Sequence, residues 1–161
     1  MIRLAVLGST ESWYVQDLRR AARREWELVP IAFRNLHSSV NAEAWEIGSG
    51  QVRLRDYDAI LVRTVPPGSL EQVVFRMDAL ARLEAGGVPV INPPKAIEAA
   101  VDKYLTTCRL ADAGFNVPRT AVCQTPEQAL VQFARLGGRV VVKPLFGGEG
   151  GGITGLDDAG L

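Results

Sequence analysis

The chain has 161 residues, of which 47% are hydrophobic and 22% charged, so it can bury a core and lacks the composition of a disordered segment. Its 18 basic and 18 acidic side chains balance, which excludes a net positive field for nucleic acid or an anionic membrane. Two cysteines and one histidine are too few for a four-ligand zinc site without carboxylates or a second chain. The start of the chain lacks the features of a signal peptide and no apolar run is long enough to cross a membrane, so we expect a soluble, cytoplasmic protein.

Short aliphatic runs alternate with helical patterns over the first part of the chain. The aliphatic runs predict strands over residues 2–8, 28–33, 58–63 and 88–91. A helix follows the first of them, and a second helix begins at a capping box in which Ser69 is followed three residues later by Gln72. Residues 36–54 give no readable pattern. This alternation predicts an α/β domain over residues 1–92, with a four-stranded parallel sheet flanked by helices.

The pattern changes after Asn92-Pro93-Pro94. An apolar helical face runs over residues 97–111, on one helix or on two consecutive helices. A strand is then predicted over residues 119–123, followed by a helix capped by Thr125 with Pro126 at its first position. Another strand is predicted over residues 139–144. These elements predict that a separate, small α+β lobe begins near residue 115.

A glycine-rich loop follows that last strand, because five of the six residues from Gly147 to Gly152 are glycine. Glycine lets backbone N–H groups approach and surround an anion, although such a loop can also be a flexible hairpin tip. The G-x-G-x-x-G spacing at Gly150, Gly152 and Gly155 is not a dinucleotide fingerprint, since it does not follow the first strand. The P-loop pattern is absent as well, since no Lys-Ser or Lys-Thr follows the glycines.

Two lysines are candidates for phosphate binding. Lys143 ends an otherwise aliphatic strand immediately before the loop. A lysine there can extend to water, but beside a glycine loop a cation aimed at phosphate oxygens is the favoured interpretation. Lys103 lies off the apolar stripe of its helix, where a lysine by itself indicates only a solvated position.

The order and spacing of several short motifs resemble the RimK-like ATP-grasp ligases, in particular the glutamate-adding ones. The motifs are Ile91-Asn92-Pro93-Pro94, Asp102-Lys103, the run from Gly114 to Thr120, and the run from Val142 to Ile153. The resemblance is specific over residues 88–153 and generic over residues 1–87, and it covers about half of a usual family member. It implies a Rossmann-like pre-ATP-grasp domain at 1–92, then linker helices and a first, incomplete part of the ATP-grasp domain at 93–161.

The resemblance also implies roles for individual residues. Lys103 and Lys143 match the two lysines that hold the phosphates of ATP. Arg63, at a strand end, matches an arginine near the acceptor substrate, although a strand-end arginine is as often structural. The flap over the phosphates matches Gly147, Gly148, Glu149, Gly150, Gly151 and Gly152, and it departs from the commoner family form at Gly148 and Gly151. No catalytic residue or metal ligand is identifiable in this chain, and the Mg²⁺ ligands are expected beyond Leu161.

The implied reaction is the ligation of an amino acid, glutamate by expectation, to a carboxylate of a small molecule, a cofactor or a peptide. ATP first converts the carboxylate to an acyl phosphate, which the amine then attacks. No nucleic acid or membrane partner is expected. The alternative is a non-catalytic nucleotide-binding or scaffold module. This portion of the protein is expected to be inactive alone and to bind ATP weakly. We also expect a mobile segment at Gly147 to Leu161 without nucleotide, and a homodimer that forms through the second lobe.

Overall fold

The computed structural model describes residues 1–22, 24–147 and 151–157. The chain divides into two compact units, Met1–Ala96 and Ile97–Leu161. Each unit is described by itself.

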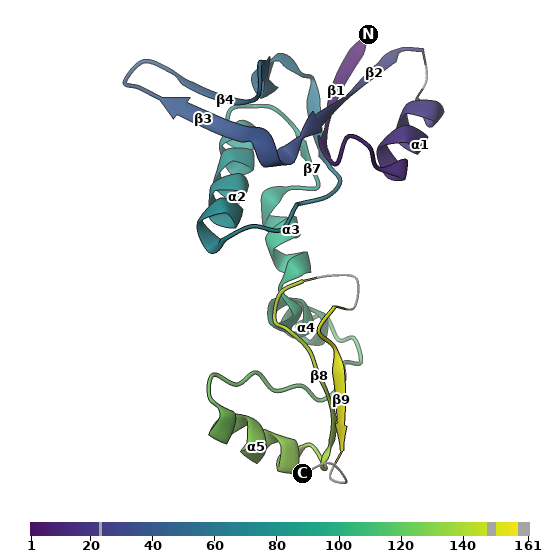
Figure 1. Ribbon diagram of the computed structural model, residues 1–161, viewed down its shortest axis with the longest axis vertical. Helices are drawn as coiled ribbons and strands as arrows, with labels where there is room; N and C mark the ends of the chain where they lie inside the picture. The colour runs from purple at the N-terminus through teal and green to yellow at the C-terminus, as the bar shows by residue number, and fades with distance from the viewer. Residues whose placement is uncertain (23, 148–150, 158–161) are drawn as a thin grey trace. The chain divides into compact units, whose positions relative to one another are not determined.

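A four-stranded parallel sheet forms the centre of the first unit, in the order β2-β1-β6-β7 (Figure 1). Its strands are β1 (Ile2–Gly8), β2 (Trp26–Ala32), β6 (Ala59–Val62) and β7 (Val90–Ile91). The aliphatic residues Ala5, Val6 and Leu7 of the central strand β1 have no exposed surface, and since successive side chains point to opposite faces, both faces of the sheet are covered there. The predicted parallel sheet is therefore confirmed.

Two helices flank this sheet, α1 (Trp13–Ala21) and α2 (Leu70–Ala85), and Figure 1 shows them on opposite sides of it. Because β2 and β7 lie on opposite sides of the β1–β6 pair, right-handed crossovers require that arrangement. Ser69 caps α2 through the predicted capping box, with both of its reciprocal hydrogen bonds present. Local sequence signals thus set where α2 begins.

The unreadable stretch forms a second, antiparallel sheet of three strands in the order β3-β4-β5. Its elements are the 3-10 turn η1 (Phe33–Asn35), β3 (Leu36–Val40), β4 (Trp45–Ser49), β5 (Val52–Arg53) and the 3-10 turn η2 (Leu54–Asp56). Four of the five residues of β3 are exposed, so the strand carries no apolar alternation to recognise. Trp45 holds the sheet to α2, where its ring lies under the guanidinium of Arg82 and beside Gly86.

The second unit contains helices and one small antiparallel sheet. Its elements are α3 (Pro94–Val101), which begins in the first unit, α4 (Lys103–Asp112), α5 (Pro126–Arg135), β8 (Arg139–Val142) and β9 (Thr154–Asp157). The apolar stretch at 97–111 therefore spans two helices, and Asp102 separates them, because its carboxylate accepts the Leu105 N–H at 2.9 Å and caps α4. Thr125 caps α5 as predicted.

The prediction of a strand over residues 119–123 is wrong. This segment has no regular structure, and no strand in the described part of the chain pairs with it. An extended segment needs a neighbouring ladder to become a strand, and β8 pairs only with β9 among the described residues. Val122 is accordingly 52% exposed.

Candidate functional site

Lys103 contacts the start of the glycine-rich loop. It is the first residue of α4, and the Asp102 cap fixes this helix turn. Its backbone N–H donates to the Leu145 carbonyl at 3.2 Å, and its side-chain Nζ donates to the Gly147 carbonyl at 2.7 Å. The structure therefore brings one of the two candidate lysines against the loop, across 44 residues of sequence.

Lys143 follows β8 (Arg139–Val142) directly and precedes the glycine-rich loop in the chain. Its side chain is exposed, and no hydrogen bond or ion pair to it is present in the described part of the chain. Strand pairing places Val142 opposite Thr154, so the glycine loop connects the adjacent ends of β8 and β9. Among the residues that the structure describes, the Lys143 ammonium group at the base of the loop thus has no partner.

Backbone conformation explains two of the glycines. Gly147 has φ of +110° and Gly152 has φ of +70°, and L-residues with a side chain rarely adopt such angles. A Cβ on Gly152 would also lie 2.9 Å from Cγ of Pro144. Gly148, Glu149 and Gly150 of the predicted flap lie outside the described residues, as do the last four residues of the segment for which mobility was predicted.

Arg63 belongs to the first unit, where it follows β6 directly. Its backbone N–H donates to the Leu7 carbonyl at 2.9 Å, and its guanidinium carbon lies 4.1 Å from the ring centroid of Tyr14 on α1. Such a contact is a cation–π interaction. Arg63 is therefore held at the end of the sheet by groups from two other elements.

Sequence reasoning missed Arg76 of α2. Its side chain is only 6% exposed, and it donates to the Pro66 carbonyl at 2.7 Å from beneath the loop that follows Arg63. The signal was its spacing of three residues from Val73 and four from Leu80, which places an arginine on the apolar face of the helix. This buried arginine therefore links α2 to the loop at Pro66.

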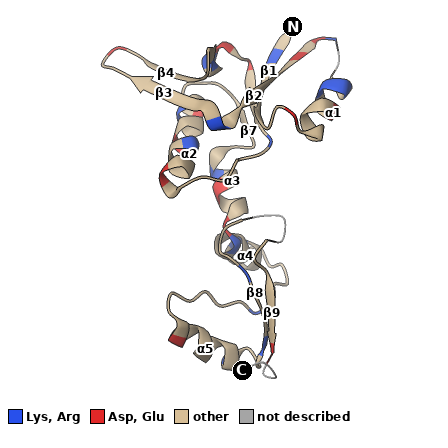
Figure 2. Cartoon of the chain, in the orientation of Figure 1, with Lys and Arg blue, Asp and Glu red and all other residues tan. Residues whose placement is uncertain are grey.

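The chain has no net charge, so any positive potential at the two lysines comes from nearby groups. Figure 2 shows basic and acidic residues interspersed along both units, in line with their equal numbers. On α4, a hydrogen bond with Cys108 raises the pKa of the Tyr104 phenol, so this group is neutral beside Lys103.

No cluster of three or more His, Cys, Asp or Glu suited to a metal ion occurs in the residues that the structure describes. None of the described helices is long and apolar enough to span a bilayer.

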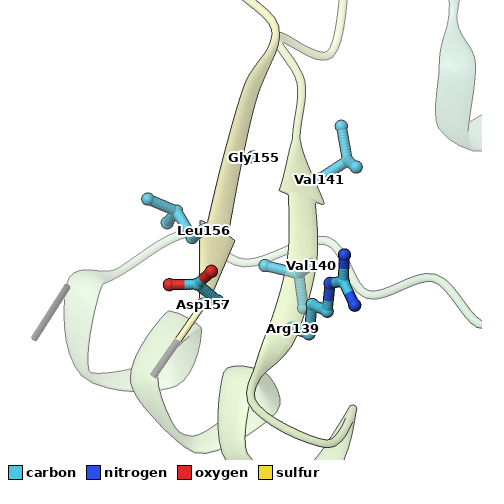
Figure 3. A pocket seen from close by; sticks show the side chains of 6 residues that line it. All are labelled: Arg139, Val140, Val141, Gly155, Leu156 and Asp157. Atoms are coloured by element: carbon cyan, nitrogen blue, oxygen red, sulfur yellow. The ribbon is translucent and has the colours of Figure 1, made fainter. Parts of the chain in front are cut away.

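A shallow groove of about 530 Å³ lies on the β8–β9 hairpin (Figure 3). Its lining comes from both strands: Arg139, Val140, Val141, Gly155, Leu156 and Asp157. Arg139 and Asp157 are paired in strand register, but neither candidate lysine lines the groove. The groove is therefore distinct from the phosphate site that the lysines and the glycine loop would form.

Solved structures with the same fold are ATP-grasp proteins. A RimK domain ATP-grasp protein from Sphaerobacter thermophilus matches 98% of this chain and 54% of its own, with 24% identity and a TM-score of 0.68. The ATP-grasp ligase PsnB complexed with a minimal precursor matches 97% of this chain and 57% of its own, with 22% identity and a TM-score of 0.64. The chain therefore has the ATP-grasp fold over the part it shares with them.

Curated relatives narrow the class, although no protein-family model matches the chain. The tetrahydromethanopterin:alpha-L-glutamate ligase of Methanosarcina acetivorans is 39% identical over 153 residues, which are 92% of this chain and 47% of the relative. The ribosomal protein bS6–L-glutamate ligase of Salmonella schwarzengrund is 30% identical over 156 residues, or 95% of this chain and 51% of the relative. The chain spans about half the length of the curated relatives it matches. It is a homologue of these glutamate ligases, and it has the ATP-grasp fold over the part that it shares with the solved structures.

Proposed function

We propose that this chain is part of an ATP-dependent carboxylate–amine ligase that joins an amino acid, glutamate by the names of its relatives, to a carboxylate. The observation that carries the proposal is the 2.7 Å contact between the Lys103 ammonium and the Gly147 carbonyl, with Lys143 at the base of the same loop. Two cations next to a glycine loop form a local site for phosphate oxygens in a chain without net charge.

In the proposed reaction, a carboxylate oxygen of the acceptor attacks the γ-phosphorus of ATP, and ADP leaves. The amine of the amino acid then attacks the acyl carbon, the phosphate leaves with its bonding electrons, and the amine loses a proton. Lys103, Lys143 and the loop amides would neutralise and orient the phosphates, which is the main task of a protein in phosphoryl transfer. Closure of Gly147 to Gly152 would exclude water from the acyl phosphate.

Mg²⁺ is expected with ATP, and PsnB has been solved with Mg and ADP. The described residues hold no cluster of carboxylates or histidines that fits the metal, so no step is assigned to Mg²⁺ in this chain. Arg63 would contact the acceptor. The relatives are named for tetrahydromethanopterin and for ribosomal protein bS6. The proposed acceptor is accordingly a carboxylate of a small molecule, a cofactor or a peptide.

Isothermal titration of the chain with Mg·ATP tests the phosphate site. We expect Lys103→Met and Lys143→Met each to weaken binding by about fivefold to tenfold, because a hydrogen bond to a charged group contributes roughly 1–1.5 kcal/mol when it is partly exposed. Arg109→Gln is the matched control, since it removes one positive charge from the exposed side of α4. Equal weakening by all three variants would show unspecific attraction and contradict the proposal.

A second assay separates a ligase from a nucleotide-binding module. ADP release is followed with a version of the chain that continues past Leu161, because the present portion is expected to be inactive alone, and candidate carboxylates are supplied with and without glutamate. Release that needs both substrates and disappears in Lys143→Met supports ligation. Specific binding of Mg·ATP without release under any substrate pair supports a non-catalytic module instead.

A further inference from the structure

The strand β3 (Leu36–Val40) leaves one edge of the antiparallel sheet open. In the order β3-β4-β5 it pairs with β4 alone, and four of its five residues are exposed. Because β5 pairs only with Gly48 and Ser49, the outer part of the hairpin has just two strands. Figure 1 shows this hairpin extending beyond α2, away from the strands of the parallel sheet. A two-stranded hairpin is marginally stable in water, so another strand beside β3 would stabilise it.

The open edge of β3 also lacks the features that usually protect an edge strand. Charged residues, proline or a short length discourage pairing with other chains. The other described edge strands have such features: β2 contains Glu27 and Pro30, β8 contains Arg139, β9 contains Asp157, and β5 and β7 have two residues each. The sequence of β3, Leu-His-Ser-Ser-Val, has no Asp, Glu, Lys, Arg or Pro. Among the described strands, β3 is therefore the one edge longer than two residues without protection.

The hydrogen-bond pattern of the hairpin shows which residues of β3 bond to β4. At the end of the hairpin the Asn41 N–H donates to the Ala44 carbonyl at 2.9 Å, and the β3–β4 register continues this pairing without a bulge. Hydrogen-bonded pairs alternate with non-hydrogen-bonded pairs along an antiparallel ladder. The backbone groups of Ser39 and His37 therefore face β4.

The remaining residues of β3 direct their backbone groups to the open edge. By the same alternation these are Leu36, Ser38 and Val40. The Leu36 N–H is already bonded, because it donates to the Phe33 carbonyl at the end of the turn η1. The edge therefore offers the N–H groups of Ser38 and Val40, together with the carbonyls of all three residues.

A second copy of β3 fits this set of donors and acceptors when it lies antiparallel with Ser38 on a two-fold axis. Ser38 of each copy then exchanges both backbone hydrogen bonds with Ser38 of the other. Each Val40 N–H meets the Leu36 carbonyl of the other copy. The Leu36 N–H needs no interchain acceptor, since the Phe33 carbonyl accepts it. Every N–H group at the edge is thus bonded.

Side chains agree with the same register. Leu36 lies opposite Val40 of the second copy, and Val40 is 81% exposed in the single chain, so an exposed apolar side chain gains an apolar neighbour. The register also brings Glu43 at the hairpin tip to Arg34 of the second copy. Both side chains are exposed, and neither has an ion pair among the described residues. Pairing β3 with itself therefore places opposite charges, and no like charges, near each other.

We propose that β3 is an interface for a second copy of this chain, in which two β3 strands pair antiparallel about Ser38 and join two antiparallel sheets into one. The interface lies on the first unit alone, and it is independent of the proposed ligase function. It also differs from the homodimer expected through the second lobe.

Sedimentation equilibrium of the chain and of two lysine variants tests the proposal. The unsubstituted chain should show a dimer fraction that rises with concentration. Ser38→Lys places two like charges opposite each other on the two-fold axis and should weaken dimerisation by about tenfold or more. Ser39→Lys is the matched control, because Ser39 is also exposed but lies opposite His37 of the second copy. This control should change the dissociation constant by about twofold or less.

Mixing two variants of opposite charge shows whether the copies meet at Ser38. Ser38→Lys and Ser38→Glu should each dimerise weakly alone, whereas an equimolar mixture should form a heterodimer, because opposite charges then face each other on the axis. Amide dispersion in NMR spectra should show both variants folded, since Ser38 is exposed. A mixture that stays monomeric, or equal weakening by Ser38→Lys and Ser39→Lys, would overturn the proposal.

Hydrogen exchange gives a second readout at the backbone. At a chain concentration ten times the dissociation constant, mass action leaves about one fifth of the chains monomeric, so the Ser38 and Val40 amides should exchange about fivefold more slowly than in dilute solution. The Ser39 amide faces β4 and should be protected at every concentration. A dimer whose Ser38 amide exchanges equally fast at all concentrations would have its interface elsewhere and would overturn the proposal. A chain that stays monomeric would overturn it as well.

Discussion

Replacing Gly147 by alanine should selectively destabilise the β8–β9 hairpin and the loop it carries. A Cβ at Gly147 meets nothing within 4 Å, so the cost is backbone strain at φ of +110° and not a clash. Such strain lowers the free energy of unfolding by about 1–3 kcal/mol. Alanine also reduces the entropy of the unfolded chain, which offsets about 0.4–1 kcal/mol of that loss. The expected net loss is roughly 1–2 kcal/mol. Gly147→Ala should also weaken Mg·ATP binding, since it moves the carbonyl that Lys103 contacts.

Gly155→Ala is the matched control for this prediction. A Cβ there also meets nothing within 4 Å, but Gly155 lies in β9 and does not have a positive φ. This variant should be unchanged or more stable by about 0.4–1 kcal/mol. Hydrogen exchange of the β8 and β9 amides measures the difference, and Gly147→Ala should exchange about 5- to 30-fold faster than wild type. Equal exchange in the two variants would refute the argument from φ.

Three further predictions concern α2. Ser69→Ala should lower the free energy of unfolding by about 1 kcal/mol in urea titrations, because it removes the capping box, whereas the exposed Ser39→Ala should have no effect. A hydrogen bond from the Ser69 hydroxyl lowers the pKa of Glu71 in the folded chain. The stability that this ionised carboxylate contributes is present above the pKa of an unfolded glutamate, about 4.3, and is lost as the pH falls through the lowered pKa. Glu71→Gln should therefore reduce the loss of stability over this acidic range in urea titrations at several pH values. Gly86→Ala should cost about 1–3 kcal/mol in thermal unfolding, because its Cβ would lie 2.6 Å from the Trp45 ring, and an unchanged midpoint would contradict that packing.

The sequence alone determined the elements that local chemistry specifies. The start of α2 follows from the Ser69 capping box, and the start of α5 from Thr125 and Pro126, because a cap bonds to the backbone only a few residues away. The buried strand β1 was predictable from its aliphatic run. The two lysines and the glycine loop were predictable as candidates because their neighbours in sequence made them unusual.

Tertiary structure decided what depends on distant partners. Residues 119–123 have the composition of a strand but no ladder, whereas the polar β3 becomes a strand because β4 pairs with it. The contact of Lys103 with Gly147 and the stacking of Arg63 on Tyr14 join residues that lie far apart in the sequence, so local patterns do not set their geometry. Strand order placed Arg63 beside the end of β1, since local sequence sets which residues form a strand and only packing of the whole sheet sets which strands are neighbours.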